Sequence, residues 1–148
     1  MTLRQYKNAS KGMKIFTIAS TAVILAAVAG LLALSFRDPS VTVEDRQIRI
    51  SGMYGQTIGF DEVKSITLIE KTMNELGPGR RINGVGGIGQ TLRGCFNSDG
   101  LGTAALFVKS RTAPTIWIEC EGRPDVYISY GDSQKTREVY EGLLSSVR

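Results

Sequence analysis

The longest uninterrupted pattern in the chain is an apolar run near its N-terminus. Residues 15–36, IFTIASTAVILAAVAGLLALSF, include no charged side chain. As an α-helix this run is about 33 Å long, which is enough to cross a hydrocarbon core of about 30 Å. The pattern therefore predicts a transmembrane helix over residues 15–36, which separates a tail over residues 1–14 from a folded domain over residues 37–148.

A cleaved signal peptide is the main alternative for the same run. Ala33-Leu34-Ser35 resembles a small-x-small cleavage site. The apolar run is nevertheless longer than the roughly 7–15 residues of a usual signal-peptide core, which favours a retained anchor. A buried helix of a soluble protein would need a polar face, and the run has none.

Beyond residue 40 the pattern changes to short runs in which apolar and polar residues alternate. Such alternation with β-branched residues is typical of strands, and Gly, Pro and Asp between the runs favour turns. Strands are expected over residues 41–43, 48–50, 57–60, 64–71, 91–97, 103–109, 115–120 and 125–130. The spacing predicts a mainly β domain, a small β-barrel or sandwich of about seven strands.

The last element has a helical period instead. Asp132 and Ser133 are favourable N-cap residues. An apolar stripe then recurs at spacings of 4, 3 and 4 residues, which places its members on one helix face. These members are Thr136, Tyr140, Leu143 and Val147. The pattern predicts one C-terminal α-helix that buries this face on the open end of the barrel.

Several short motifs recur in an order that resembles a bacterial pleckstrin-homology-like (PH-like) family. They are Tyr54-Gly55 through Ile58, residues 62–66, residues 81–86, Gly94-Cys95-Phe96, residues 114–116, residues 126–128, Lys135-Thr136 and residues 140–143. The resemblance implies a PH-like barrel capped by a helix and a position beside a membrane, and it implies no substrate. Many such relatives have two membrane helices, whereas this chain has one candidate.

The net charge of +4 belongs to the N-terminal tail. Arg4, Lys7, Lys11 and Lys14 are its charged residues, and the remaining 14 basic side chains balance 14 acidic ones. A nucleic-acid-binding domain concentrates its basic residues on the folded part, so this distribution argues against nucleic acid as a partner. The lipid bilayer is the expected partner of residues 15–36.

Basic residues and small residues give further expectations for the membrane segment. Four basic residues precede it, which predicts a cytoplasmic N-terminus and an extracytoplasmic domain at a bacterial cell membrane, although Arg37 follows closely. Ala22, Ala26 and Gly30 lie four residues apart, a spacing that allows two helices to pack closely as a homodimer. An ordinary alanine-rich membrane helix accounts for the same stripe.

The composition excludes most catalytic chemistry. The chain has no histidine, and its two cysteines cannot form a disulfide framework or a four-thiolate zinc site. The carboxylates are scattered, so we expect no enzyme activity, no metal and no cofactor. Alternation predicts that Cys120 faces the core and that Cys95 faces away from it.

A glycine-rich segment over residues 74–89 is expected to form a loop. Within it, Gly84-x-Gly86-x-x-Gly89 matches the dinucleotide fingerprint in letters, but the segment lacks the strand–turn–helix context that the chemistry requires. Residues 80–93 combine three arginines with flexible glycines and no acid. The predicted partner-binding residues are Arg80, Arg81, Asn83, Gly84, Gly86 and Arg93.

These patterns together predict a single-pass membrane protein whose PH-like domain is a non-catalytic binding module for an unidentified protein partner. The alternative is a secreted or envelope-localised PH-like domain released by signal-peptide cleavage.

Overall fold

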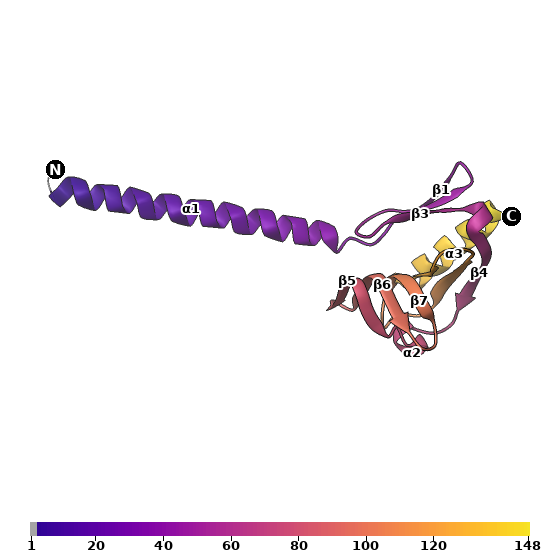
Figure 1. The fold of residues 1–148 in the computed structure, drawn as a ribbon. Coiled ribbons are helices and arrows are strands. Elements are labelled where there is room, and N and C mark those ends of the chain that lie inside the picture. Colours follow the sequence, from indigo (N-terminus) through magenta and orange to yellow (C-terminus); the bar gives the residue numbers. More distant parts are fainter. Residues whose placement is uncertain (1–2) are drawn as a thin grey trace. The chain divides into compact units, whose positions relative to one another are not determined.

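The computed structural model describes residues 3–148 and divides the chain into two units, with the boundary between Arg37 and Asp38 (Figure 1). The first unit is the helix α1 (Leu3–Ser35). Within its apolar span Lys7–Leu34, the most apolar 18-residue window has a mean hydropathy of 2.4, and none of that window is buried. A helix that is long and apolar enough to cross a membrane is therefore present, as the sequence predicts.

The basic residues of the N-terminus belong to α1, because the helix is continuous from Leu3 and extends beyond the apolar run. Helix-forming Arg, Gln, Lys and Ala residues favour this extension. The spacing of 3, 4 and 3 residues places four cations on one face of the helix. These are Arg4, Lys7, Lys11 and Lys14, and all four are exposed.

The second unit begins with a three-stranded antiparallel sheet. Its strands are β1 (Val41–Glu44), β2 (Gln47–Ile50) and β3 (Gln56–Gly59), in the order β1-β2-β3. Asp45 and Arg46 both have positive φ angles, 50° and 59°, as a two-residue hairpin turn requires. The expected hairpin over residues 41–50 is thus confirmed.

A six-stranded sheet forms the larger layer. Its strands are β4 (Val63–Ile69), β5 (Arg80–Ile88), β6 (Thr91–Ser98), β7 (Gly102–Lys109), β8 (Thr115–Cys120) and β9 (Asp125–Ile128). The order is β4-β8-β9-β7-β6-β5, and β7 and β9 form its one parallel pair. Short helices η1 (Phe60–Glu62) and α2 (Met73–Leu76) flank β4, and α3 (Ser133–Val147) ends the chain.

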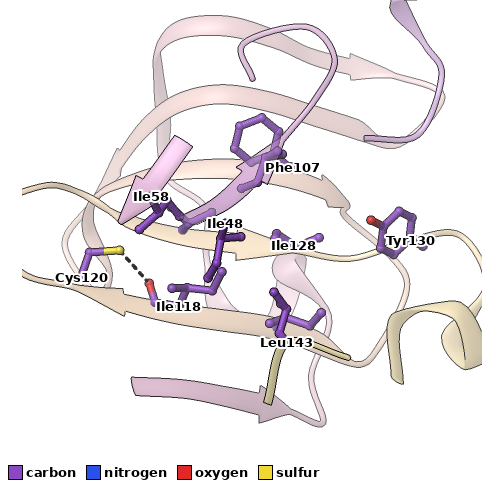
Figure 2. Packing of buried hydrophobic residues seen from close by; sticks show 11 residues of the cluster. Ile48, Ile58, Phe107, Ile118, Cys120, Ile128, Tyr130 and Leu143 are labelled. Atoms are coloured by element: carbon purple, nitrogen blue, oxygen red, sulfur yellow. Dashed lines mark hydrogen bonds between the residues drawn. The ribbon is translucent and has the colours of Figure 1, made fainter. Parts of the chain in front are cut away.

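Each face of the six-stranded sheet contributes to a buried apolar cluster. On the inner face, apolar residues of the sheet pack against the three-stranded sheet and α3. We call this group the first cluster; it includes Ile118, Ile48 and Leu143 (Figure 2). The second cluster lies on the other face, where Met73 of α2 is fully buried near Phe96 and Leu106. A strand buried on both faces has few polar positions, which explains the near-continuous apolar run Ala104–Val108 in β7.

The mainly β character and the C-terminal helix agree with the sequence, but a closed barrel is wrong. Each sheet is open and has two edge strands: β1 and β3 in one, β4 and β5 in the other. The helix α3 packs against β1, β4 and β8, so a helix takes the place of a hydrogen-bonded closure on that side. The described residues form nine strands, whereas about seven strands in eight candidate segments are expected; β5 matches none of these segments.

The expected loop over residues 74–89 is also wrong, since it contains α2 and most of it is the strand β5. Gly84 of β5 and Gly94 of β6 lie opposite one another with φ angles of 128° and 116°. A Cβ atom on either glycine would overlap a carbonyl oxygen of the neighbouring strand. The two backbones therefore approach more closely than side chains allow, and pairing with β6 outweighs the weak strand propensity of the segment.

The helix α3 has the predicted face. Leu143 is 2% exposed, and Tyr140 and Val147 pack against the first cluster. The Asp132 side chain accepts a hydrogen bond from the backbone N–H of Gln134 at 2.9 Å, which caps the helix as expected.

We predict that Leu143→Ala destabilises the domain by about 2–5 kcal/mol, because it leaves a cavity between α3 and the two sheets. Leu144→Ala is the matched control, since Leu144 is half-buried and lies outside both clusters. Urea unfolding followed by the fluorescence of Trp117, the single tryptophan, measures both variants. Equal effects would show that α3 is not part of the core.

Candidate functional site

One row of side chains crosses the inner face of the six-stranded sheet from edge to edge. The directly paired residues are Ile66, Ile118, Val126, Ala105, Cys95 and Asn83, from β4, β8, β9, β7, β6 and β5. The first four members belong to or pack against the first cluster, whereas Cys95 is half-buried and Asn83 is exposed. The cover over this face is therefore incomplete at β6 and β5.

A cavity of about 200 Å³ lies where the cover is incomplete. Tyr54 and Gln56 line it from the side of the three-stranded sheet, and Asn83 and Cys95 line it from β5 and β6. Its other lining residues are Gly94, Ala105, Phe107 and Pro124. We call this cavity with the adjoining strand β5 the open seam. The volume is below the roughly 300–1,000 Å³ of sites for drug-sized ligands and suits a single side chain or a small group.

Arg123 holds one wall of the open seam in place. Its Nη1 donates to the carbonyl oxygen of Thr57 at 2.7 Å, and its Nη2 donates to the Oε1 of Gln56. Nη1 also lies 3.3 Å from the Oε2 of Glu62. The hydrogen bond from the Gly59 N–H lowers the pKa of Glu62, and Arg123 lowers that pKa further. The positive charge of Arg123 is thus paired with the carboxylate of Glu62.

The wall also leaves a hydrogen-bond donor unused. The Nε2 atom of Gln56 is buried and has no hydrogen-bond partner within residues 3–148. Buried amide groups normally have a partner, and an unpaired one costs about 1–3 kcal/mol. Because Gln56 lines the cavity, its amide is a candidate donor for a group that enters there.

Two thiols lie on the inner face and differ in access. Cys120 is buried in the first cluster, as predicted, and burial raises the pKa of its thiol. Cys95 lies on the opposite face of β6 from Phe96, which also agrees with the alternation. That face is nevertheless the inner one, so Cys95 lines the cavity instead of facing away from the domain.

The three arginines of residues 80–93 are not brought together. Arg80 and Arg81 are exposed on β5, and their places opposite Asn97 and Phe96 direct them to different faces of the sheet. Arg93 is 2% exposed and lies on the inner face opposite Phe107. The expectation of one flexible cationic loop is therefore wrong.

Arg93 belongs to a buried polar group where the second unit begins. Burial lowers the pKa of its guanidinium, and attraction to Asp38 and Tyr130 raises it. The Tyr130 hydroxyl donates to the carbonyl oxygen of Pro39 at 2.8 Å, and burial raises the pKa of Tyr130 to about 12. Lys135 lies 3.7 Å from Asp38 and stacks over the Tyr130 ring. Together these residues fasten the first residues of the domain to its core.

Of the remaining predicted residues, Asn83 and Gly84 lie at the open seam, and Gly86 does not. Asn83 lines the cavity and Gly84 follows it on β5, opposite the lining residue Gly94. Gly86 lies on the other face, where an added Cβ would contact Leu92 and Phe96. Gly84, Gly86 and Gly89 precede the strand β6 and not a helix, so the arrangement lacks the helix N-terminus of a dinucleotide site.

Sequence reasoning missed Tyr54, Gln56 and Arg123 as parts of one site. Tyr54 has a positive φ angle of 63° within the turn between β2 and β3 and is 42% exposed. The positive φ angle is unusual for a large aromatic residue. The pattern of a single sequence carries no signal for the contact between Arg123 and β3, which are 66 residues apart.

No protein-family model, curated protein or solved structure matches this chain. The PH-like resemblance stays a prediction from the motifs of the sequence.

We predict that Arg93→Glu destabilises the domain by about 3–5 kcal/mol, because it buries a carboxylate close to Asp38. Arg80→Glu and Arg81→Glu are the matched controls, and each should change the stability by no more than about 0.5 kcal/mol at an exposed position. Urea unfolding of the three variants separates the two outcomes. An unchanged midpoint for Arg93→Glu would show that the guanidinium is not part of the packed core.

Proposed function

We propose that this protein is a single-pass membrane protein whose β domain acts as a non-catalytic, PH-like binding module. The observation that carries the proposal is the open seam, where the inner face of a well-packed sheet is left uncovered beside an unpaired edge strand. Binding residues commonly lie where a rigid scaffold leaves such a surface. The apolar helix α1, with its most apolar window fully unburied, supports the membrane anchor.

The proposed orientation has the N-terminus in the cytoplasm and the domain outside it. The four cations on one face of α1 support this orientation, since basic residues are retained on the cytoplasmic side. Ala22, Ala26 and Gly30 are exposed on α1, and nothing lies within 4 Å of a Cβ added to Gly30. This surface supports a homodimer of membrane helices as part of the proposal.

Release of the domain by signal-peptide cleavage is the second candidate. The apolar helix lies near the N-terminus and ends at Ser35, the last residue of the small-x-small site Ala33-Leu34-Ser35. A cleaved chain and an anchored chain differ in the mass of the mature protein, so one measurement separates them.

We predict that the mature protein keeps residues 1–35 and stays in the membrane pellet after alkaline carbonate washing, because an intact membrane helix resists extraction. Mass spectrometry of the pelleted protein measures the mature N-terminus. A soluble product that lacks residues 1–35 would replace the anchor with the cleavage alternative.

The same preparation tests the orientation. Gly100→Cys and Asn8→Cys place one thiol in the domain and one near the N-terminus, in a Cys95→Ser background that removes the half-buried thiol. Gly100 is exposed, and nothing lies within 4 Å of an added Cβ. A membrane-impermeant maleimide should label Gly100→Cys in spheroplasts and label Asn8→Cys only after lysis. The reverse pattern would place the domain in the cytoplasm.

A further inference from the structure

Three of the four edge strands contact α3 or Arg123, and β5 is the fourth edge strand. The helix α3 packs against β1 and β4, which are the edges on its side. Arg123 occupies the edge of β3 through its hydrogen bond to the Thr57 carbonyl oxygen. Among the described strands, β6 alone pairs with β5. An unpaired edge presents a row of backbone donors and acceptors to another chain.

The unpaired edge strand β5 is also long. β5 has nine residues, more than any other strand of the described chain. Its pairing with β6 shifts register between Arg81 and Asn83 and again between Gly86 and Ile88. Such bulges blunt the two ends of an edge strand. Between the two shifts, residues 83–86 pair with β6 in continuous register.

Exposed apolar side chains of the domain are concentrated at the same place. Ile82 is 61% exposed and Tyr54 is 42% exposed, and these are the large hydrophobic side chains of the second unit that are exposed among those described. Ile82 lies on β5, and Tyr54 lines the cavity beside Asn83. A partner of this surface therefore gains apolar contacts as well as backbone hydrogen bonds.

The positive charge at the edge of β5 favours an acidic partner. No acidic residue occurs between Glu75 and Asp99. Arg80 and Arg81 are exposed at the start of β5, and neither takes part in an ion pair within the described residues. Two guanidinium groups on opposite faces of one edge strand are complementary to a strand with carboxylates on both of its faces.

We infer that the edge of β5 binds an extended peptide segment bearing carboxylate and apolar side chains, which adds to the six-stranded sheet as a seventh strand. Backbone hydrogen bonds along residues 83–86 supply the affinity, and the cavity beside Asn83 takes one side chain of the segment. This inference rests on the proposed function, since it names the class of partner for the open seam.

The test uses the full chain in phosphatidylcholine nanodiscs and a fluorescent peptide of glutamate and valine with the same nine-residue length as β5. Adjacent glutamates in this peptide place carboxylates on both faces of the extended strand. We expect saturable binding by fluorescence anisotropy and slower hydrogen exchange of the β5 amides in the complex. A peptide with a methyl group on every backbone nitrogen keeps the carboxylates but loses the donors, and it should not bind. Equal binding of both peptides would overturn strand addition.

Charge reversal on the protein tests whether peptide binding depends on the edge of β5 or only on the net charge of the domain. The double variant Arg80→Glu/Arg81→Glu should raise the Kd for the acidic peptide by about tenfold or more. Lys64→Glu/Arg111→Glu changes the net charge equally at exposed positions away from β5 and should leave the Kd unchanged. Equal effects of both pairs, or protection of β4 amides in place of β5 amides, would overturn the inference.

Absence of binding by the acidic peptide would also overturn the inference. That outcome would leave the anchor and its orientation intact, because membrane retention and maleimide labelling do not involve β5.

Discussion

Burial of the six-stranded sheet on both faces is the constraint on which the rest of the domain depends. Neighbouring strands lie about 4.8 Å apart, so a six-stranded layer needs a wide cover on each side. The segment around α2 supplies part of it on one face, and the three-stranded sheet with α3 supplies it on the other. The inner cover becomes incomplete over β6 and β5, and the open seam forms there. The cavity is thus a consequence of a mismatch in the widths of the two layers.

Arg93 lies on β6, where the cover of the inner face becomes incomplete, and it marks the boundary of the first cluster. An apolar side chain at this position would extend the first cluster toward Asp38, whereas the guanidinium introduces a charge that needs a nearby opposite charge. Asp38 and the Tyr130 hydroxyl lie close enough to interact with it. The polar group in turn fastens Pro39, so the boundary of the core and the start of the domain are stabilised by the same residues.

Much of the fold could be predicted from local patterns. The apolar run of α1, the alternation in β6 to β9 and the stripe ending at Val147 are each properties of a continuous segment, and each predicts its element. β5 could not be predicted in this way, because its glycines have poor strand propensity and its conformation depends on the close approach of Gly84 to Gly94. Closure of a barrel was predicted wrongly for a similar reason, since it depends on contacts between distant edges.

The candidate site was predicted only in part. Residues 80–86 were selected for their charge and glycine content, and Asn83 does line the cavity. The other wall comes from Tyr54 and Gln56, which reach the site through the packing of one sheet on the other. The sequence places Arg93 on the same surface because residues 80–93 combine three arginines and flexible glycines with no acid. Its burial follows from the register of β6 against β7, which places it opposite Phe107.

The fastening at Pro39 has a mechanical consequence. β1 is a four-residue strand at the edge of its sheet, and a pull on its N-terminal end would separate it from β2 one hydrogen bond at a time. The Tyr130 hydroxyl and Lys135 hold the chain just before that strand, at Pro39 and Asp38. Tension that arrives from the N-terminal side is therefore borne first by the base of α3 and the end of β9. The short edge strand β1 therefore carries less of this tension.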